Sequence, residues 1–258
     1  MSILLNDKTI LITNVSNKLG QALSQRLGFA GANLFVSDSN DQKLRKTTHD
    51  LKKLGLKVTG AVVDVTVNEQ RKQLFDEIEK KYGGLDVLVA NPLTNTVKGE
   101  IISSTKMEFD DVYNKNLTTP FKLCRDAVPL LSKAKNGGSV IFLTSFAGYS
   151  PFEEIGLYSA VSTGLLGLTK AASIDLAKKN IRVNSVVLGM MVNDGSGAFW
   201  SDESGDEARL SQLSKLIPLG RIPKSSEATA FVEFLASSRS RYITGENCVV
   251  NGGVSVRI

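Results

Sequence analysis

The chain contains few of the residues that build metal sites and disulfide frameworks. Its 258 residues include one histidine, two cysteines and one tryptophan. Cys124 and Cys248 both lie in apolar stretches, and His49 lies in a polar stretch of helical character. We therefore expect no disulfide framework and no metal site, and we expect an intracellular, cytoplasmic protein in a reducing environment.

Long hydrophobic runs are also missing. No apolar stretch approaches the roughly 20 residues that a transmembrane helix requires. The segment from Met1 to Asn6 is too short and too uncharged for a secretory signal. The sequence therefore predicts no membrane span and an N-terminus that belongs to the fold.

The positive charge is spread thinly, although the net charge is +5 and the isoelectric point is about 9.1. Basic residues occur as short pairs, such as Lys52-Lys53 and Lys178-Lys179, with acidic residues between the pairs. No basic stripe with interleaved aromatic residues is visible. The pattern is typical of solvated helix faces, and we expect no nucleic-acid partner.

Short β-branched runs alternate with longer amphipathic stretches, which predicts one α/β domain over residues 1–258. Strands are expected at Thr9–Thr13, Asn33–Ser37, Val58–Asp64, Leu85–Ala90, Ser139–Ser145, Arg182–Val187 and Asn247–Val250. Helices are expected at Leu19–Ala30, Asp41–Leu54, Val67–Tyr82, Lys106–Lys135 and Leu157–Lys179. The continuously apolar strands predict a doubly wound, Rossmann-type parallel sheet with helices on both faces. The stretch Met190–Asp206 breaks the alternation and is expected to be a flap on the substrate side.

The turn after the first strand reads Thr13-Asn14-Val15-Ser16-Asn17-Lys18-Leu19-Gly20. A phosphate-binding turn here uses three glycines, for a tight turn, for close approach of the diphosphate and for helix packing. Only the third, Gly20, is present. Asn14 can adopt the left-handed conformation of the first glycine. Lys18 replaces the second, and we expect its side chain to obstruct a diphosphate; the alternative is that it pairs with phosphate as a point charge.

Two acidic residues follow the next strands. Asp38 follows the second strand, where a carboxylate accepts from a ribose 2′-hydroxyl and repels a 2′-phosphate. This favours NAD over NADP, with binding expected to be weak or absent. The alternative role for Asp38 is to cap the next helix. After the third strand, Asp64 and Val65 are placed to meet an adenine edge, and Asp64 also suits a helix cap.

Ser145 ends the fifth strand, and Tyr158 follows thirteen residues later at the start of a helix. With Asn116 on the preceding helical stretch, these residues resemble the site of the short-chain dehydrogenases/reductases. In that family the serine orients a carbonyl, the tyrosine exchanges the proton and the asparagine holds a relay water. Ile243-Thr244-Gly245 and Asn251-Gly252-Gly253 resemble its C-terminal pattern. Leu165–Lys170 and Asn180–Asn184 are most similar to its peroxisomal tetrameric carbonyl reductases, of the dehydrogenase/reductase member 4 type.

The catalytic lysine of this family is replaced by Ser162, four residues after Tyr158 and on the same helix face. A nearby cation lowers the pKa of a phenol, so without it only about one tyrosine in a thousand is ionised at neutral pH. The lysine also holds the nicotinamide ribose in the family, and a serine is too short to do so. Each surviving residue also has a structural alternative, since Ser145 can cap a turn, Tyr158 can be a half-buried aromatic and Asn116 can bridge two backbone segments.

Further departures lie around the same site. Ala90-Asn91-Pro92-Leu93 replaces the family's Asn-Asn-Ala-Gly, so that only Asn91 matches. Leu188-Gly189 replaces Pro-Gly, and Asn193 replaces a threonine that meets the nicotinamide amide. The terminus Val256-Arg257-Ile258 only distantly resembles a peroxisomal address.

Two functions follow from these matches and departures. The first is a catalytically silent or strongly impaired member of the fold that acts as a binding or oligomerising partner. The alternative is an active NAD(P)-dependent carbonyl reductase or alcohol dehydrogenase that uses Ser145 and Tyr158. The resemblance also implies a homo-oligomer, a tetramer or a dimer.

Overall fold

The computed structural model describes residues 4–92, 97, 99–189, 211–212 and 214–254. Within these residues one seven-stranded sheet has the order β3-β2-β1-β4-β5-β6-β7, and every neighbouring pair is parallel. The strands are β1 (Thr9–Ile12), β2 (Asn33–Asp38), β3 (Val58–Val62), β4 (Val87–Ala90), β5 (Gly138–Ser145), β6 (Ile181–Leu188) and β7 (Asn247–Val250). The predicted doubly wound parallel sheet is therefore confirmed.

The strand order reverses beside β1, which pairs with both β2 and β4. The chain builds outward from β1 to β3 and then returns to build β4 to β7 on the other side. Every residue of β1 and β4 is buried, as expected for central strands covered on both faces. Loops that leave the carboxyl ends of these two strands diverge, and this is where parallel α/β sheets bind ligands.

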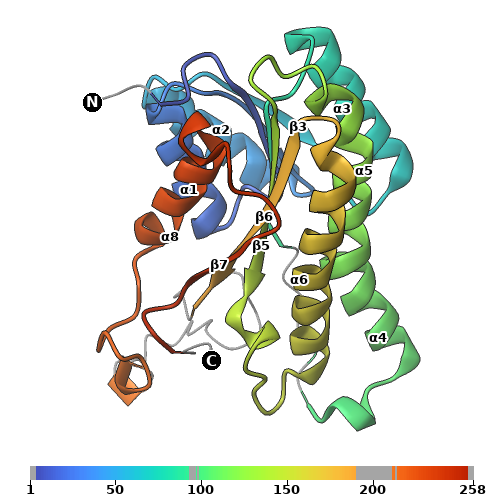
Figure 1. Cartoon of the computed structure of the whole chain (residues 1–258), viewed down its shortest axis with the longest axis vertical. Helices are drawn as coiled ribbons and strands as arrows, with labels where there is room; N and C mark the ends of the chain where they lie inside the picture. The colour runs from blue at the N-terminus through green and yellow to red at the C-terminus, as the bar shows by residue number, and fades with distance from the viewer. Residues whose placement is uncertain (1–3, 93–96, 98, 190–210, 213, 255–258) are drawn as a thin grey trace.

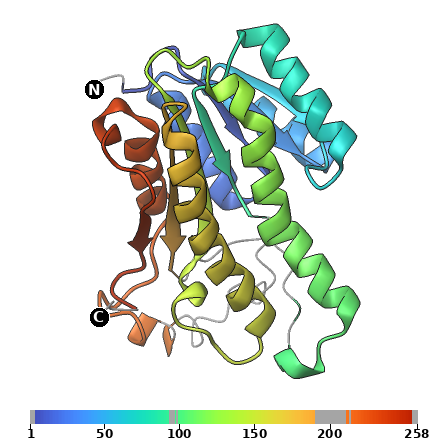
Figure 2. The ribbon, with the colours of Figure 1, turned by 45° about the vertical axis from the view of Figure 1, so that its right-hand side comes forward.

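Helices cover both faces of the sheet (Figure 1). The helices on one face are α1 (Lys18–Phe29), α2 (Asp41–Lys53) and α8 (Ser225–Ala236), and their apolar residues share one core cluster. The helices on the other face are α3 (Asn68–Tyr82), α5 (Thr119–Leu131) and α6 (Gly156–Ala177), which share a second cluster. Figure 2 shows α5 and α6 side by side in front of the sheet. Short 3₁₀ turns lie at Ile101–Ser103, Phe146–Gly148 and Ser238–Ser240.

The long helix expected over Lys106–Lys135 is interrupted. It comprises α4 (Lys106–Tyr113), a π-helical segment (Asn114–Thr118) and α5, which ends at Leu131. Pro120 accounts for the interruption, because proline has no N–H to give to the carbonyl four residues earlier and its ring clashes with that carbonyl. The π segment carries Asn116, so the irregular turn sets the direction of a candidate site residue.

Several sequence expectations lie outside the described residues or remain predictions. The flap at Met190–Asp206, Leu93, Asn193 and the terminal Val256-Arg257-Ile258 are not among the described residues. Helix α8 was not expected from the sequence. Over the described ranges, no helix is both long enough and apolar enough to cross a membrane.

Candidate functional site

The turns after β1 and β4 are tied together at the point where the strand order reverses. The backbone N–H of Asn91 donates to Thr13 Oγ1 at 3.2 Å, and Asn91 Nδ2 donates to the carbonyl of Asn14 at 2.9 Å. Asn14 Nδ2 in turn donates to the carbonyl of Pro92. The amide side chains of Asn14 and Asn91 thus fix the floor of the site, a contact that the sequence did not reveal.

Asn14 has a φ of 53°, so it adopts the left-handed conformation expected of it in place of glycine. Gly20 fills the role of the third glycine, since a Cβ there would lie 2.6 Å from the Val15 carbonyl oxygen. Asn17 caps α1 by accepting from the Gly20 N–H at 2.7 Å. The turn therefore keeps its shape with a single glycine. Lys18, the first residue of α1, is exposed, and its obstruction of a diphosphate stays a prediction.

Asp38 ends β2 and is 6% exposed. Its Oδ2 accepts from the Ser16 N–H at 2.9 Å and its Oδ1 from the Asn40 N–H at 3.0 Å. The cap of α2 is Asn40, so the alternative that Asp38 caps this helix is wrong. Asp38 instead joins the turn after β1 to the end of β2 and places a negative charge beside the cleft.

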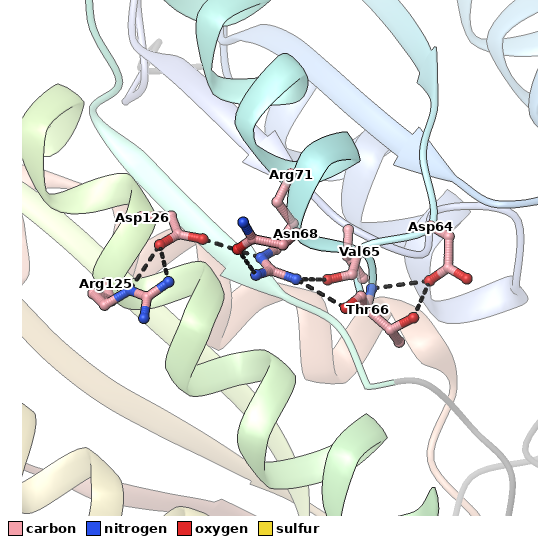
Figure 3. Close-up of polar contacts among 7 residues, drawn as sticks. All are labelled: Asp64, Val65, Thr66, Asn68, Arg71, Arg125 and Asp126. Carbon is pink, nitrogen blue, oxygen red and sulfur yellow. Dashed lines mark hydrogen bonds and ion pairs between the residues drawn. The ribbon is translucent and has the colours of Figure 1, made fainter.

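The turn after β3 is built around Asp64 and Arg71 (Figure 3). Asp64 Oδ1 accepts from the N–H and the hydroxyl of Thr66 at 2.9 and 2.7 Å. The cap of α3 is Val67, without a side-chain hydrogen bond, so Asp64 closes the turn and does not cap the helix. Arg71 is fully buried and donates to the carbonyls of Val65 and Thr66. Arg71 was missed from the sequence, although it occupies the buried stripe of α3 with Leu74, Phe75 and Ile78.

Ser145 and Tyr158 meet across the gap between β5 and α6. The hydroxyls of Ser145 and Ser162 lie close to that of Tyr158. Burial raises the pKa of this phenol above its usual 10.0, and the two neighbouring hydroxyls lower it only in part. Ser145 Oγ also accepts from the Ala147 N–H at 3.2 Å, so it caps a turn as well. The site therefore holds an uncharged phenol between two hydroxyls.

Asn116 is 5% exposed and lines a small cavity with Tyr158, Ser162 and Pro92. This cavity has a volume of about 10 Å³. Asn116 Nδ2 donates to the Val112 carbonyl at 3.1 Å within its own helical stretch. The alternative that Asn116 bridges two separate backbone segments is therefore wrong.

Three buried polar atoms suit a polar ligand in the cleft. Among the described residues six buried side-chain atoms lack a hydrogen-bond partner, and three of them, Ser16 Oγ, Asn91 Oδ1 and Asn116 Oδ1, lie in the turns after β1 and β4 and in the π segment. Unpaired buried polar atoms are uncommon in native proteins and point to water or a ligand. Together with Asp38 and the N-terminus of α1, these atoms fit a nicotinamide dinucleotide. No group of three or more histidine, cysteine or acidic residues suited to a metal occurs among the described residues.

Comparison with known proteins places these residues in a family context. Residues 15–255 match a family model described as Enoyl-(Acyl carrier protein) reductase. The chain is 34% identical over 254 residues to dehydrogenase/reductase SDR family member 4 of Sus scrofa, covering 98% of this chain and 89% of that protein. The Homo sapiens protein of the same name is also 34% identical over 254 residues, covering 98% and 90%. A short-chain type dehydrogenase/reductase from Mycobacterium marinum superposes with a TM-score of 0.88 at 26% identity, covering 99% and 98% of the two chains.

The raised pKa of Tyr158 predicts a loss of stability in alkali. The neutral phenol is favoured in the folded protein, so ionising Tyr158 costs more there than in the unfolded chain. The contribution of Tyr158 to the free energy of unfolding is therefore complete below about pH 10, the pKa of an unfolded tyrosine. It is lost as the pH rises toward the folded pKa. Urea unfolding of the wild type and of Tyr158→Phe, measured across this range, should give free energies whose difference falls by about 1.4 kcal/mol per pH unit above pH 10. A difference that stays constant up to about pH 11 contradicts the assignment.

Proposed function

The chain belongs to the short-chain dehydrogenase/reductase family, and on this premise we propose that it is a slow nicotinamide-dependent carbonyl reductase whose proton donor is uncharged Tyr158. The observation that carries the proposal is the close grouping of the Ser145, Tyr158 and Ser162 hydroxyls. A serine and a tyrosine in contact at the carboxyl end of β5 suit a carbonyl oxygen that gains a proton during reduction.

The two hydroxyls have different tasks. Ser145 donates a hydrogen bond that orients the carbonyl oxygen, and Tyr158 transfers its phenolic proton to that oxygen as the C–O group becomes an alcohol. A reduced nicotinamide, when bound, supplies the hydride. Ser162 donates a hydrogen bond to the phenolate that remains, in the place where the family has a lysine. A neutral donor stabilises that phenolate less than a cation does, so the transfer is slow.

The protonation state of Tyr158 sets the pH dependence. Reduction needs the neutral phenol, whereas oxidation of an alcohol needs the phenolate as base. Because burial raises the pKa of Tyr158, the neutral form predominates throughout the physiological range. The arrangement therefore supports reduction at neutral pH and alcohol oxidation only in alkali.

Asp38 supports NADH as the preferred coenzyme. Its two oxygens already accept backbone N–H groups, but each retains a second lone pair for a ribose hydroxyl. The same carboxylate repels a 2′-phosphate. Asn14, Leu19 and Gly20 would hold the diphosphate half beside the Lys18 side chain, which we expect to obstruct it, and Asn91 would hold the ribose on the nicotinamide side.

An exposed apolar groove favours a second function, self-association, which a catalytically silent protein would retain. The groove lies between α5 and α6 and has a volume of about 550 Å³. Its lining includes Phe121, 46% exposed, together with Val128 and Leu168. Arg125, Lys179 and Asp175 add charges of both signs, which would allow opposite charges to pair when two copies of the surface pack across a two-fold axis. We propose that a second copy of the chain covers this groove.

The reductase proposal predicts slow oxidation of NADH in the presence of a generic diketone, with a smaller effect for NADPH. Tyr158→Phe should lower this rate about 100-fold or more, because a positioned general acid contributes at least that factor. The wild-type rate should be flat from pH 6 to about 9 and should fall as the phenol ionises above about pH 10. An unchanged rate in Tyr158→Phe contradicts the role of Tyr158 as proton donor. No binding of either coenzyme at millimolar concentration leaves the silent protein as the function.

Restoring the family's residues should strengthen the site. Asn14 already has the required backbone conformation, so Lys18→Gly and Ser162→Lys suffice. We expect the dissociation constant for NADH to fall about 10-fold, equivalent to about 1.4 kcal/mol, and the alkaline limb of the rate profile to move to lower pH. Adding Tyr158→Phe to this variant should keep the tighter binding and remove the rate gain. Unaltered NADH affinity means that Lys18 does not obstruct the diphosphate.

The groove predicts self-association through α5 and α6. Phe121→Glu should shift the protein toward the monomer in sedimentation velocity, because it places a charge in the centre of the apolar lining. Phe29→Glu is the matched control, since Phe29 is also exposed, at 63%, but ends α1 on the opposite face of the sheet. An identical mass distribution for wild type and Phe121→Glu contradicts the proposal.

A further inference from the structure

Arg71 has the most buried charged side chain among the described residues, at 0% exposure. Its Nε donates to Asp126 Oδ2 on α5 at 3.0 Å. Its Nη1 donates to the carbonyls of Val65 and Thr66 at 2.8 and 3.1 Å, and its Nη2 to Asn68 Oδ1 at 2.9 Å (Figure 3). Four hydrogen bonds from one guanidinium therefore join two helices to the turn after β3.

The position of β3 explains why this turn needs such support. β3 is one of the two edge strands of the sheet and pairs only with β2 among the described strands. Beyond the strand, the Val63 N–H still donates to the Asp38 carbonyl at 2.9 Å, but the turn from Asp64 to Thr66 has no neighbouring strand on its outer side. Arg71 ties this turn to α3 and, through Asp126, to α5. These hydrogen bonds restrain the turn in place of those that a further strand would provide.

The charge of Arg71 is balanced in a way that favours rigidity. Asp126 accepts from Arg71 with one oxygen and from the Arg125 side chain with the other, at 2.7 to 2.8 Å. Burying a guanidinium is costly unless its hydrogen bonds are well made, and here the planar fork matches two carbonyls and a carboxylate at once. A lysine would keep the charge but could not reproduce this set of directions.

The turn lies where the base of a bound nucleotide belongs. The Asp38 carbonyl accepts from Val63, which directly precedes this turn. The Asp38 carboxylate accepts from Ser16 in the turn after β1. A nucleotide with its diphosphate at α1 and its ribose at Asp38 therefore directs its base toward Asp64. Asp64 keeps a carboxylate oxygen for an exocyclic amine, whereas Val65 is 4% exposed and packs in the core beneath the turn.

The geometry points to Arg71 as a positioning residue that holds this turn in place to recognise the adenine base, an inference that rests on the proposed dinucleotide function. Arg71 touches neither substrate nor coenzyme. It acts by fixing the Val65 and Thr66 carbonyls, and through them the direction of the Asp64 carboxylate.

The test compares reduced NAD with its hypoxanthine analogue, in which a carbonyl replaces the adenine amine. Isothermal titration should show that the wild type prefers the adenine form. In Arg71→Lys the ratio of the two dissociation constants should fall at least 5-fold toward one. The turn loses its fixed position in this variant, while the charge beside Asp126 remains. A purely structural loss weakens both dinucleotides equally and leaves the ratio intact.

Two further variants keep the test decisive. Asp126→Asn weakens the same arrangement from α5 and should shift the ratio in the same direction even if Arg71→Lys folds poorly. Lys133→Met is the matched control, because Lys133 pairs with Glu79 of α3 far from the turn, and it should leave the ratio unchanged.

The outcomes distinguish a failure of the role of Arg71 from a failure of the reductase proposal. An unaltered ratio in Arg71→Lys and Asp126→Asn, an equal shift in Lys133→Met, or a wild type without preference overturns the role of Arg71 alone. A wild type that binds neither dinucleotide overturns the reductase proposal and this inference together.

Discussion

Parallel pairing of the strands is the constraint on which the whole site depends. Because every strand runs in one direction, the residues that follow β1, β2, β3, β4 and β5 all emerge at the same edge of the sheet. Residues as distant in sequence as Asn14, Asp38 and Asn91 lie there in turns that hydrogen bonds join to one another. The central register, in which Ile12 is paired with both Val36 and Val89, determines how these turns face one another.

The turn after β1 shows how a binding loop keeps its shape after its sequence has changed. Asn14 adopts a backbone conformation suited to glycine, and its side chain compensates by binding the Pro92 carbonyl. Asn91 returns a hydrogen bond to the Asn14 carbonyl. The hydrogen bonds of two asparagine side chains therefore hold this turn in the conformation that glycines would otherwise allow. The base of the cleft keeps its shape as a result.

Much of the fold follows from the sequence, because buried parallel strands produce continuous apolar runs. β7 has the expected bounds, β6 differs by one residue at both ends, and each of the other strands differs by one or two residues at one end only. The pair Ser145 and Tyr158 was predictable for the same reason, since strand five and the next helix were both clear. Asp38 and Asn116 were harder, because the partner of a polar side chain depends on which loop lies next to it. The Asp38 partners come from residues 16 and 40, on opposite sides of the strand.

Arg71 and the π segment are two features that the residue pattern of the sequence did not predict. In α3 the buried positions are Arg71, Leu74, Phe75 and Ile78, so the arginine occupies a place in an apolar stripe. Among so many lysines and glutamates it looks like one more solvated charge, and only its helical phase distinguishes it. Pro120 was a comparable signal within an otherwise regular helical stretch.

The π segment also restricts how this protein can change over evolutionary time. A π turn contains one residue more than an α turn of the same span. Deleting a single residue from Asn114–Thr118 and closing the segment into regular helix would therefore leave α4 and α5 in nearly the same helical phase, because the π turn already absorbs the extra residue. Only the residues of the π segment itself, Asn116 among them, would change direction. The length of this short stretch is therefore constrained by the direction of Asn116 and not by the packing of the helices on either side.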